Sequence, residues 1–272
     1  MCYTVLCYPY QVQTDMDING KEGFQGMLST DYLAGSIYHM VHFANLRQIF
    51  QRGAILSKEK VAQEGISYQS IAYRSVQVLR DRIYVYDFSE NRLRPLHSYV
   101  PFYFAIRTPM LYVQYIKGLQ DEIVIFEISR SVLKEQGVIF TDGNASNQQL
   151  GKFTGEIAKI VPATVSQDIC RRSYRPDGQP GGSNPNRSDF YADVAFLDRL
   201  NWNIINGRNF LEEEEKRIKH AEVLIPDLLP LGKVQGLYVC TRDKEQVVNT
   251  LIREIGLDGR IPFAQAKPEL FF

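Results

Sequence analysis

The stretch SIYHMVHFANLRQIFQRG, residues 36–53, decides the fold because its hydrophobic period changes from that of a strand to that of a helix. Residues 37–41 are a short run rich in β-branched and aromatic side chains, which predicts a strand. From Phe43 to Phe50 the apolar residues recur at helical spacing, and Gly53 is the residue type that most readily adopts the left-handed helix end. We therefore expect a strand that leads directly into a helix.

Strand and helix patterns alternate outward from this stretch. Strands are predicted at residues 83–86, 102–106, 122–128, 138–140, 221–225 and 234–239. Helices are predicted at residues 71–82, 110–118, 129–137, 189–200, 210–220 and 242–255. The spacing is irregular and the glycine fingerprint of a doubly wound sheet is absent, so the pattern favours an α+β fold with a small split sheet.

Composition places the chain among ordinary globular proteins. Of its 272 residues, 44% are apolar and 23% charged, which excludes disordered, collagen-like and coiled-coil chains. The 31 Lys and Arg residues equal the 31 Asp and Glu residues. This balance argues against binding nucleic acid through bulk charge, although a local basic patch on a neutral protein can still contact phosphates.

The domain organisation follows from where the patterns begin and lapse. Residues 1–36 read as an irregular N-terminal extension, and residues 37–272 as one domain. Within that domain, RPDGQPGGSNPNR at 175–187 is dense in Gly, Pro and Asn, which predicts a flexible insertion near 151–188.

No metal site or membrane segment is expected. The cysteines form no CxxC pair and lack a histidine at metal-ligand spacing, and they fit a reducing compartment. The acidic turn that begins at Asp15 imitates a calcium loop, but its twelfth position is Gly26 where a bidentate Glu is needed. The chain shows no signal peptide and no apolar run long enough to cross a membrane, so we expect a cytoplasmic protein.

Three isolated polar residues are candidates for chemistry, and each also has a plain structural interpretation. His39 lies on the first predicted strand, where a core or surface histidine is common. Glu222 opens an apolar strand, where it is either paired, in a cleft or at a sheet edge. Arg80 lies in a helical segment and is most simply a solvated surface group. The P-loop, HExxH and GxSxG motifs are absent.

The sequence segments that contain these residues resemble the DarT family of DNA ADP-ribosyltransferase toxins. That family belongs to the wider diphtheria-toxin-like and PARP-like ADP-ribosyltransferase fold. The resemblance is carried by IYHMVHFANLRQIF at 37–50, IAYRSVQVLRDR at 71–82, LHSYVPFYFAIRTPMLY at 96–112, IFTDGNAS at 139–146, FLDRLNW at 196–202 and KRIKHAEVLIP at 216–226.

This resemblance implies an ADP-ribosyltransferase-like split β-sheet core and transfer of ADP-ribose from NAD, the co-substrate, to a base of single-stranded DNA. Thymine is the favoured base and guanine the second choice. It also implies the toxin of a toxin–antitoxin pair, with a macrodomain-type ADP-ribosyl hydrolase as the antitoxin. By motif, Glu222 and Arg80 are the catalytic residues and His39 binds NAD. The NAD site is expected to use no metal.

Residue chemistry suits these implied roles. A carboxylate stabilises the positive charge that builds on the ribose as the nicotinamide bond breaks. A guanidinium has too high a pKa to accept a proton, so we expect Arg80 to orient the base and stabilise its developing anion. Tyr38 and Tyr103 offer aromatic faces near His39 on which a ring could stack.

The run KRIKH is the candidate DNA-contact segment, and it contains Lys216, Arg217, Lys219 and His220. A solvated helix face is the plainer interpretation, and the acidic residues just before the run weaken a basic patch. Two other functions stay open: an ADP-ribosyltransferase acting on RNA or protein, and a non-catalytic module that binds NAD or nucleic acid.

Overall fold

The computed structural model describes residues 32–148, 157–164 and 187–272. Most of the predicted N-terminal extension, with its calcium-like turn, lies outside the described residues, as does most of the predicted insertion. No helix in the described ranges is long and apolar enough to cross a membrane.

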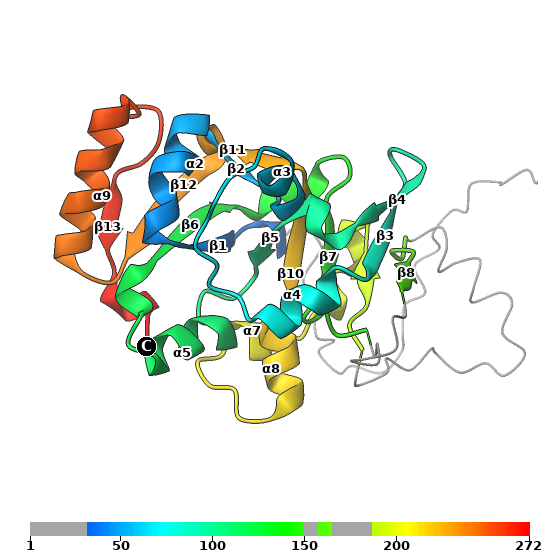
Figure 1. Ribbon diagram of the computed structural model, residues 1–272. Helices are drawn as coiled ribbons and strands as arrows, with labels where there is room; N and C mark the ends of the chain where they lie inside the picture. The colour runs from blue at the N-terminus through cyan, green and yellow to red at the C-terminus, as the bar shows by residue number, and fades with distance from the viewer. Residues whose placement is uncertain (1–31, 149–156, 165–186) are drawn as a thin grey trace, which may run out of the picture.

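A mixed sheet forms the centre of the molecule (Figure 1). Its strands run in the order β13-β12-β6-β1-β5-β10-β7-β9. Their bounds are β1 Ser36–His42, β5 Tyr99–Tyr103, β6 Ile123–Ser129, β7 Ile139–Thr141, β9 Phe190–Tyr191, β10 Glu222–Pro226, β12 Val234–Val239 and β13 Ala264–Ala266. Neighbouring strands are antiparallel except for the parallel pair β12 and β13. The predicted α+β class is confirmed.

The central sheet is divided between β1 and β5. These two strands share a single register pair, Tyr38 with Tyr103. In contrast, β1 pairs with β6 along its whole length, from Ser36 to His42. Strand β5 pairs with β10 from Glu222 to Pro226. The sheet therefore consists of two halves that meet at one point, which is the split core expected from the resemblance.

Two small sheets flank the central one. Strands β2 (Ala54–Leu56) and β11 (Leu228–Pro230) form a pair. Strand β3 (Ile83–Asp87) lies between β4 (Arg92–Pro95) and β8 (Ala158–Ile160). Because β8 pairs with β3 in parallel, the described part of the 151–188 segment belongs to regular structure.

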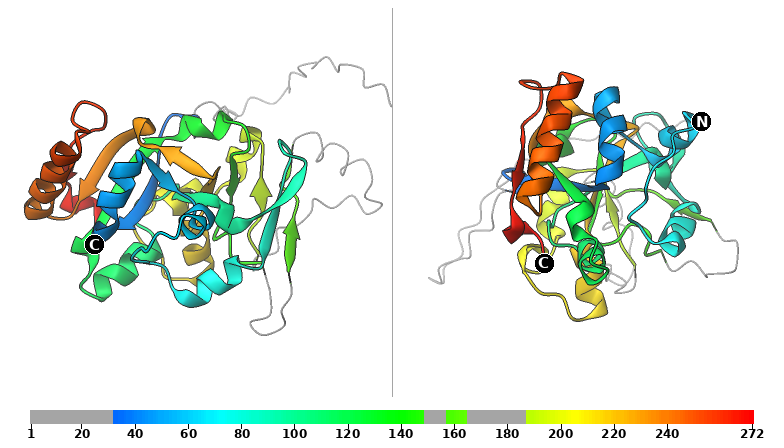
Figure 2. Two further views of the ribbon diagram at one scale, coloured as in Figure 1. Left: turned by 45° about the horizontal axis from the view of Figure 1, so that its top comes forward. Right: turned by 60° about the vertical axis from the view of Figure 1, so that its left-hand side comes forward.

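Seven helices of the described ranges pack around the sheets. Their bounds are α2 Leu46–Arg52, α3 Lys58–Gln63, α4 Arg74–Arg80, α5 Pro109–Ile116, α7 Trp202–Asn206, α8 Glu213–Lys219 and α9 Arg242–Ile255. Short 3₁₀ turns span Phe43–Asn45, Leu96–Ser98, Gln120–Glu122, Arg130–Lys134, Val194–Arg199, Leu231–Lys233 and Pro268–Leu270. Helices α2 and α9 lie side by side over one end of the sheet, and the small sheet of β3, β4 and β8 lies at the other (Figure 2).

The main hydrophobic core joins these helices to the sheet. Phe50 of α2 packs edge-on against Phe126 of β6, with ring centroids 6.5 Å apart. Val248 and Ile252 of α9 are fully buried in the same cluster. The predicted amphipathic face of α2 is thus the face that packs, and Gly53 ends the helix with a positive φ of 66°.

Several sequence predictions place elements incorrectly. The helix predicted at 129–137 is only the 3₁₀ turn Arg130–Lys134. The strand predicted at 102–106 runs instead from Tyr99 to Tyr103, and the chain leaves the ladder at Phe104 to pack that ring against Trp202. The helix predicted at 189–200 begins with strand β9, because its aromatic residues are buried against β7. An uninterrupted apolar run does not by itself distinguish a buried strand from a helix.

Candidate active site

Three elements that are distant in sequence bring the three candidate residues to one cavity of about 350 Å³. His39 comes from β1, Arg80 ends α4, and Glu222 begins β10. The register places Glu222 opposite Tyr103, which is the residue at the single contact between the two halves of the sheet. The cavity therefore opens where the sheet divides.

Arg80 and Glu222 form a buried ion pair. The Nη1 atom of Arg80 lies 3.1 Å from Oε1 and 3.0 Å from Oε2 of Glu222. Only 8% and 2% of the two side chains are exposed. The plain sequence interpretations, a surface arginine and an edge glutamate, are therefore wrong. Removing one partner of such a pair leaves an uncompensated buried charge, at a cost of about 3–5 kcal/mol.

The turn after β7 fixes the Glu222 carboxylate. The main-chain N–H of Ala145 donates to Oε1 at 3.0 Å. The main-chain N–H of Glu222 itself donates to Thr141 Oγ1 at 3.1 Å. Asn144, in the same turn, lines the cavity. In the sequence this segment stands out only as part of the family resemblance, and its short Asp-Gly-Asn turn was the signal that could have placed it beside the strand.

His39 bridges the divided sheet. Its Nδ1 lies 2.7 Å from the carbonyl oxygen of Pro101 on β5. A carbonyl only accepts, so Nδ1 carries the proton and Nε2 is left as an acceptor. Burial lowers the pKa of His39 to about 4, and the ring is therefore neutral at pH 7. The Phe102 ring packs 5.2 Å away and holds the imidazole in place.

The two candidate tyrosines point into different cavities. Tyr103 lines the cavity with His39, its ring lies edge-on to His220 at 6.0 Å, and burial raises its pKa. Tyr38 lines a second cavity with Arg130, because successive side chains on a strand face opposite ways. Tyr38 therefore cannot form the stacking face beside His39 that the sequence suggested.

The candidate DNA-contact run is not one basic face. Lys216 is half-exposed and pairs with Glu213 at 2.6 Å. Arg217 is buried and contacts Glu214 at 2.7 Å and Asp142 at 3.2 Å. Successive residues of helix α8 point in different directions, so the run divides among three surroundings.

The last two residues of the run are buried on either side of its end. Lys219 is only 2% exposed and donates to the carbonyl oxygens of Ile205 and Gly207. His220 lines the cavity of the candidate active site, and its Nδ1 lies 2.9 Å from the carbonyl oxygen of Lys216. Since Nδ1 must donate to that carbonyl, His220 Nε2 is an acceptor. Burial lowers the pKa of His220 and keeps the ring neutral.

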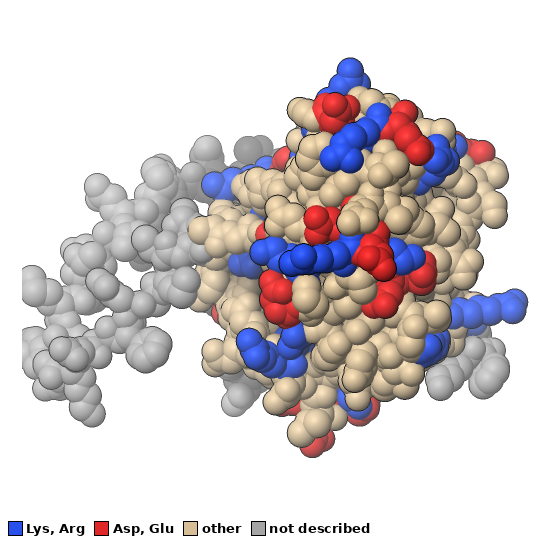
Figure 3. All heavy atoms as spheres, turned by 90° about the vertical axis from the view of Figure 1, so that its left-hand side faces the viewer, with Lys and Arg blue, Asp and Glu red and all other residues tan. Residues whose placement is uncertain are grey.

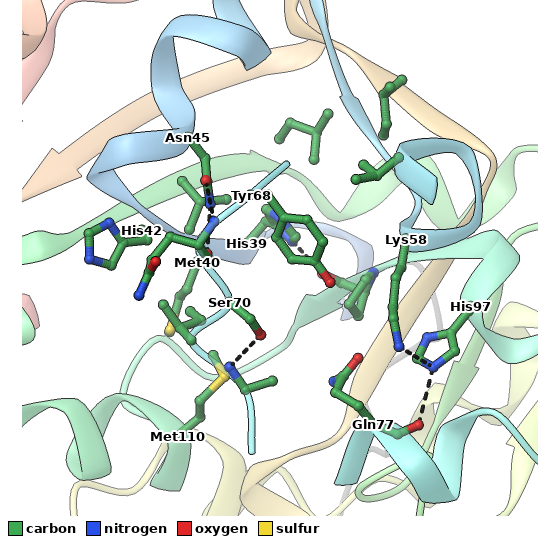
Figure 4. A pocket seen from close by; sticks show the side chains of 18 of the residues that line it. His39, Met40, His42, Asn45, Lys58, Tyr68, Ser70, Gln77, His97 and Met110 are labelled. Atoms are coloured by element: carbon green, nitrogen blue, oxygen red, sulfur yellow. Dashed lines mark hydrogen bonds between the residues drawn. The ribbon is translucent and has the colours of Figure 1, made fainter. Parts of the chain in front are cut away.

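Figure 4 shows further polar residues for which the sequence carries no motif. The ring of Tyr68 lies between His39 and Lys58 in this view. Lys58 Nζ lies 3.0 Å from His97 Nε2 and 3.5 Å from Asp81, and the same Nε2 lies 3.3 Å from the carbonyl oxygen of Gln77. Burial and the nearby Arg80 lower the pKa of His97 to about 4. Sequence offered no signal for this cluster, since its members come from separate elements.

Comparison with known proteins shows that the chain matches the family model "ssDNA thymidine ADP-ribosyltransferase, DarT" over residues 38–180 and 177–272. The chain belongs to the DarT family. Membership confirms the resemblance seen in the sequence and makes the chain an NAD-dependent ADP-ribosyltransferase.

The chain is also similar in sequence to two proteins with transferase names. A DNA ADP-ribosyl transferase of Thermus aquaticus is 26% identical over 225 residues, which cover 80% of this chain and 81% of the relative. A DNA ADP-ribosyl transferase-DNA ADP-ribosyl glycohydrolase fusion protein of Thermosipho africanus is 26% identical over 131 residues, covering 48% of this chain and 32% of the fusion.

Solved DarT structures share the fold. The Thermus sp. 2.9 DarT in complex with ADP-ribosylated ssDNA superimposes with a TM-score of 0.65 at 22% identity, covering 87% of this chain and 96% of that one. The same protein in complex with NAD+ gives a TM-score of 0.61 at 21% identity, with 87% and 97% covered. The split sheet is therefore the DarT fold.

Proposed function

We propose that this chain transfers ADP-ribose from NAD to a thymine base of single-stranded DNA. The observation that carries the proposal is the buried Arg80–Glu222 pair, which shares one cavity with the neutral His39. Family membership and the DNA-bound Thermus structure support the choice of acceptor. Single-stranded DNA is also the easier substrate, because a base need not be pulled from a duplex.

The residues present suit NAD as the co-substrate. His39 Nε2 is a fixed acceptor that can receive a hydrogen bond from a ribose hydroxyl. Tyr68 and Tyr103 line the cavity and supply aromatic surface against which a ring can pack. The cavity, about 350 Å³, has the size of ordinary small-molecule sites.

Transfer requires the bond between the ribose carbon and the nicotinamide nitrogen to break. Its electron pair leaves with nicotinamide, and positive charge builds on the ribose. In our proposal the Glu222 carboxylate stabilises this charge, with Ala145 N–H holding one of its oxygens. A ring nitrogen of thymine then forms the new bond to the ribose carbon and loses its proton.

We assign that proton to His220. Its Nε2 is unprotonated and the side chain lines the same cavity as Glu222. Arg80 cannot accept a proton, since a guanidinium remains charged in proteins. Arg80 therefore orients the base and stabilises its developing negative charge, while His220 acts as the general base.

The biological setting is proposed on the same grounds. The Thermosipho relative joins a transferase and a glycohydrolase in one chain. We propose that this chain is likewise the toxin of a toxin–antitoxin pair, countered in the cytoplasm by a macrodomain-type hydrolase that removes the modification. Guanine is the second candidate base.

A panel of acceptors tests the proposed substrate. The full chain is incubated with labelled NAD and single-stranded oligonucleotides that each lack one base, together with RNA and protein acceptors. We expect label on every DNA that contains thymine and none on DNA that lacks it. If only oligonucleotides that contain guanine are labelled, guanine is the modified base and thymine is not. Label on RNA or protein alone would contradict a DNA acceptor.

A further inference from the structure

A second cavity, of about 260 Å³, shares a wall with the candidate active site. Tyr103 lines the first cavity and the next residue, Phe104, lines the second. Likewise His220 lines the first cavity and Lys219 the second. The backbone at Tyr103–Phe104 and at Lys219–His220 therefore belongs to the lining of both cavities.

The lining of the second cavity is strongly cationic. Four of its side chains are positively charged: Arg107, Arg130, Arg208 and Lys219. The single carboxylate residue of the lining is Glu269, whose side chain is 64% exposed and lies 4.0 Å from Lys267. Arg107 contacts Glu269 through the main-chain carbonyl oxygen, at 2.6 Å, which leaves the arginine charge without a carboxylate in that contact.

Among the residues that the structure describes, carbonyl groups alone hold the buried ammonium of Lys219. It donates to the main-chain oxygens of Ile205, at 2.7 Å, and of Gly207. An ammonium has three N–H donors, so these bonds leave one for a ligand. Burial, and then the charge of Arg107, lowers the pKa of Lys219 to about 8. A negative charge in the cavity would offset both effects.

Arg130 is similarly placed. Its Nη1 and Nη2 donate to the carbonyl oxygens of Tyr32 and Ser36, at 2.7 and 3.2 Å. Its guanidinium lies over the Trp202 ring, 4.6 Å from the centroid. Its Nε is buried without a hydrogen-bond partner within the part of the chain that the structure describes. A buried donor left unsatisfied costs about 1–3 kcal/mol.

We propose that the second cavity binds a phosphate group of the DNA strand, next to the base that enters the active site. A phosphate is an anion that arginine and lysine side chains recognise, and its charge would compensate four cations for which the described lining holds one carboxylate residue, Glu269. Because the two cavities share this wall, we infer that the phosphate belongs to the same strand as the base beside His220 and Glu222. The assignment rests on the proposed function, because it presumes a DNA acceptor.

This site is tested by measuring how a single-stranded oligonucleotide binds the full chain. Fluorescence anisotropy gives the affinity at several salt concentrations. The variant is Arg107→Gln with Arg208→Gln, and the matched control is Arg253→Gln with Arg260→Gln, which removes two exposed charges at and after α9. We expect the first pair to weaken binding at least tenfold and to reduce the salt slope by roughly 0.7 for each phosphate that is no longer neutralised. The control pair is expected to bind like the wild type.

Further arms separate the possible sources of the phosphate. The exposed Arg208→Gln variant alone is expected to show a smaller loss of DNA affinity, so the test survives if the double variant fails to fold. The cavity would bind a free anion if inorganic phosphate raised the melting temperature of the protein while the variants kept the wild-type affinity for DNA. That result would overturn the assignment to a DNA phosphate. Equal DNA affinity and salt slope in all variants would overturn the site. Wild-type transfer to thymine, measured in parallel, reports separately on the proposed function.

Discussion

Glu222 is held from three directions, by Arg80, by the Ala145 N–H and through its own N–H by Thr141. A carboxylate fixed in this way is already in place when charge builds on the ribose, so its replacement should lower the rate of transfer. The neighbouring buried charges make the choice of substitution important, since removing the whole side chain would leave Arg80 unpaired.

We predict that Glu222→Gln lowers transfer by about 100-fold or more, because the amide keeps the shape but not the charge. The measurement is the initial rate of labelled ADP-ribose transfer to DNA, with the melting temperature as a check on folding. Glu90→Gln, an exposed change near β4, is the control and should leave the rate unchanged. Full activity in a folded Glu222→Gln protein would remove Glu222 from the reaction.

Arg80→Ala is expected to bind NAD while scarcely modifying DNA, because the guanidinium acts on the base. Calorimetry measures NAD binding and the transfer assay measures the second effect. Arg74→Ala provides a matched control, since Arg74 is exposed at the other end of helix α4. Equal transfer by Arg80→Ala and the wild type would exclude Arg80 from the mechanism.

If His220 is the general base, the rate of transfer should depend on pH. Its pKa is lowered by burial, while the charge of Glu222 opposes that shift and the Tyr103 ring adds no charge. The acceptor form therefore predominates at neutral pH, and transfer should fall as the pH drops below the ordinary histidine pKa of about 6.5. His220→Gln should lower the rate and flatten this acidic limb. An unchanged pH profile in that variant would exclude His220 as the base.

At the scale of elements, the turn between β7 and the following segment positions the site. A Cβ atom on Gly143 would lie 2.8 Å from Ser188 Oγ and 3.0 Å from Arg217 Cγ, so the backbone there approaches its neighbours as only glycine allows. Ala145, which holds Glu222, follows two residues later. The turn and the carboxylate are therefore coupled through close packing.

We predict that Gly143→Ala destabilises the protein by about 1–3 kcal/mol, as overpacking does, and lowers transfer. Gly232→Ala is the control, because an added Cβ there meets nothing within 4 Å. Denaturant unfolding and the transfer assay check both variants. Equal stability and activity of the two proteins would show that the turn does not need the glycine.

Local pattern predicted some elements well and others poorly. Helix α9 spans the predicted residues 242–255 because both ends carry strong signals: Thr241 Oγ1 accepts from the Lys244 N–H, and Gly256 adopts a φ of 74°. The boundaries of β5 and the strand β9 were missed, since neighbouring strands rather than local propensity decide them.

The same limit applied to the site. The Arg80–Glu222 contact joins residues 142 positions apart, and no periodicity in either segment indicates it. Only the family resemblance linked the two residues in advance. The separation of Tyr38 from its chain neighbour His39 was open to prediction from strand alternation, whereas the burial of Lys219 depends on carbonyl groups at the end of α7 and just after it.

Across the molecular surface, the charged side chains of the two signs do not form separate patches on the face shown in Figure 3. Figure 3 shows Lys and Arg residues interspersed with Asp and Glu over the face it presents. Positive and negative side chains are therefore mixed on this face, in keeping with the equal numbers of the two in the sequence. In our account, cations concentrate instead in the small cavity beside the active site.

Stability should depend on pH through the buried histidines. Burial lowers the pKa values of His39 and His97 to about 4. Between pH 6.5 and 4 the unfolded chain therefore binds more protons than the folded one, and the free energy of unfolding should decrease as the pH falls through that window, by about 1–3 kcal/mol for His39. Urea unfolding at several pH values measures this. His39→Gln should make the dependence shallower, and an unchanged slope would contradict the assignment.

Mass spectrometry of nucleosides, digested from a thymine-containing oligonucleotide after incubation with the protein and NAD, tests the central claim most directly. We expect thymidine that carries one ADP-ribosyl group on its ring N–H nitrogen with the wild-type protein, and loss of this product with folded Glu222→Gln. Unmodified thymidine with the wild type, or the same product at the same rate from Glu222→Gln, would contradict it.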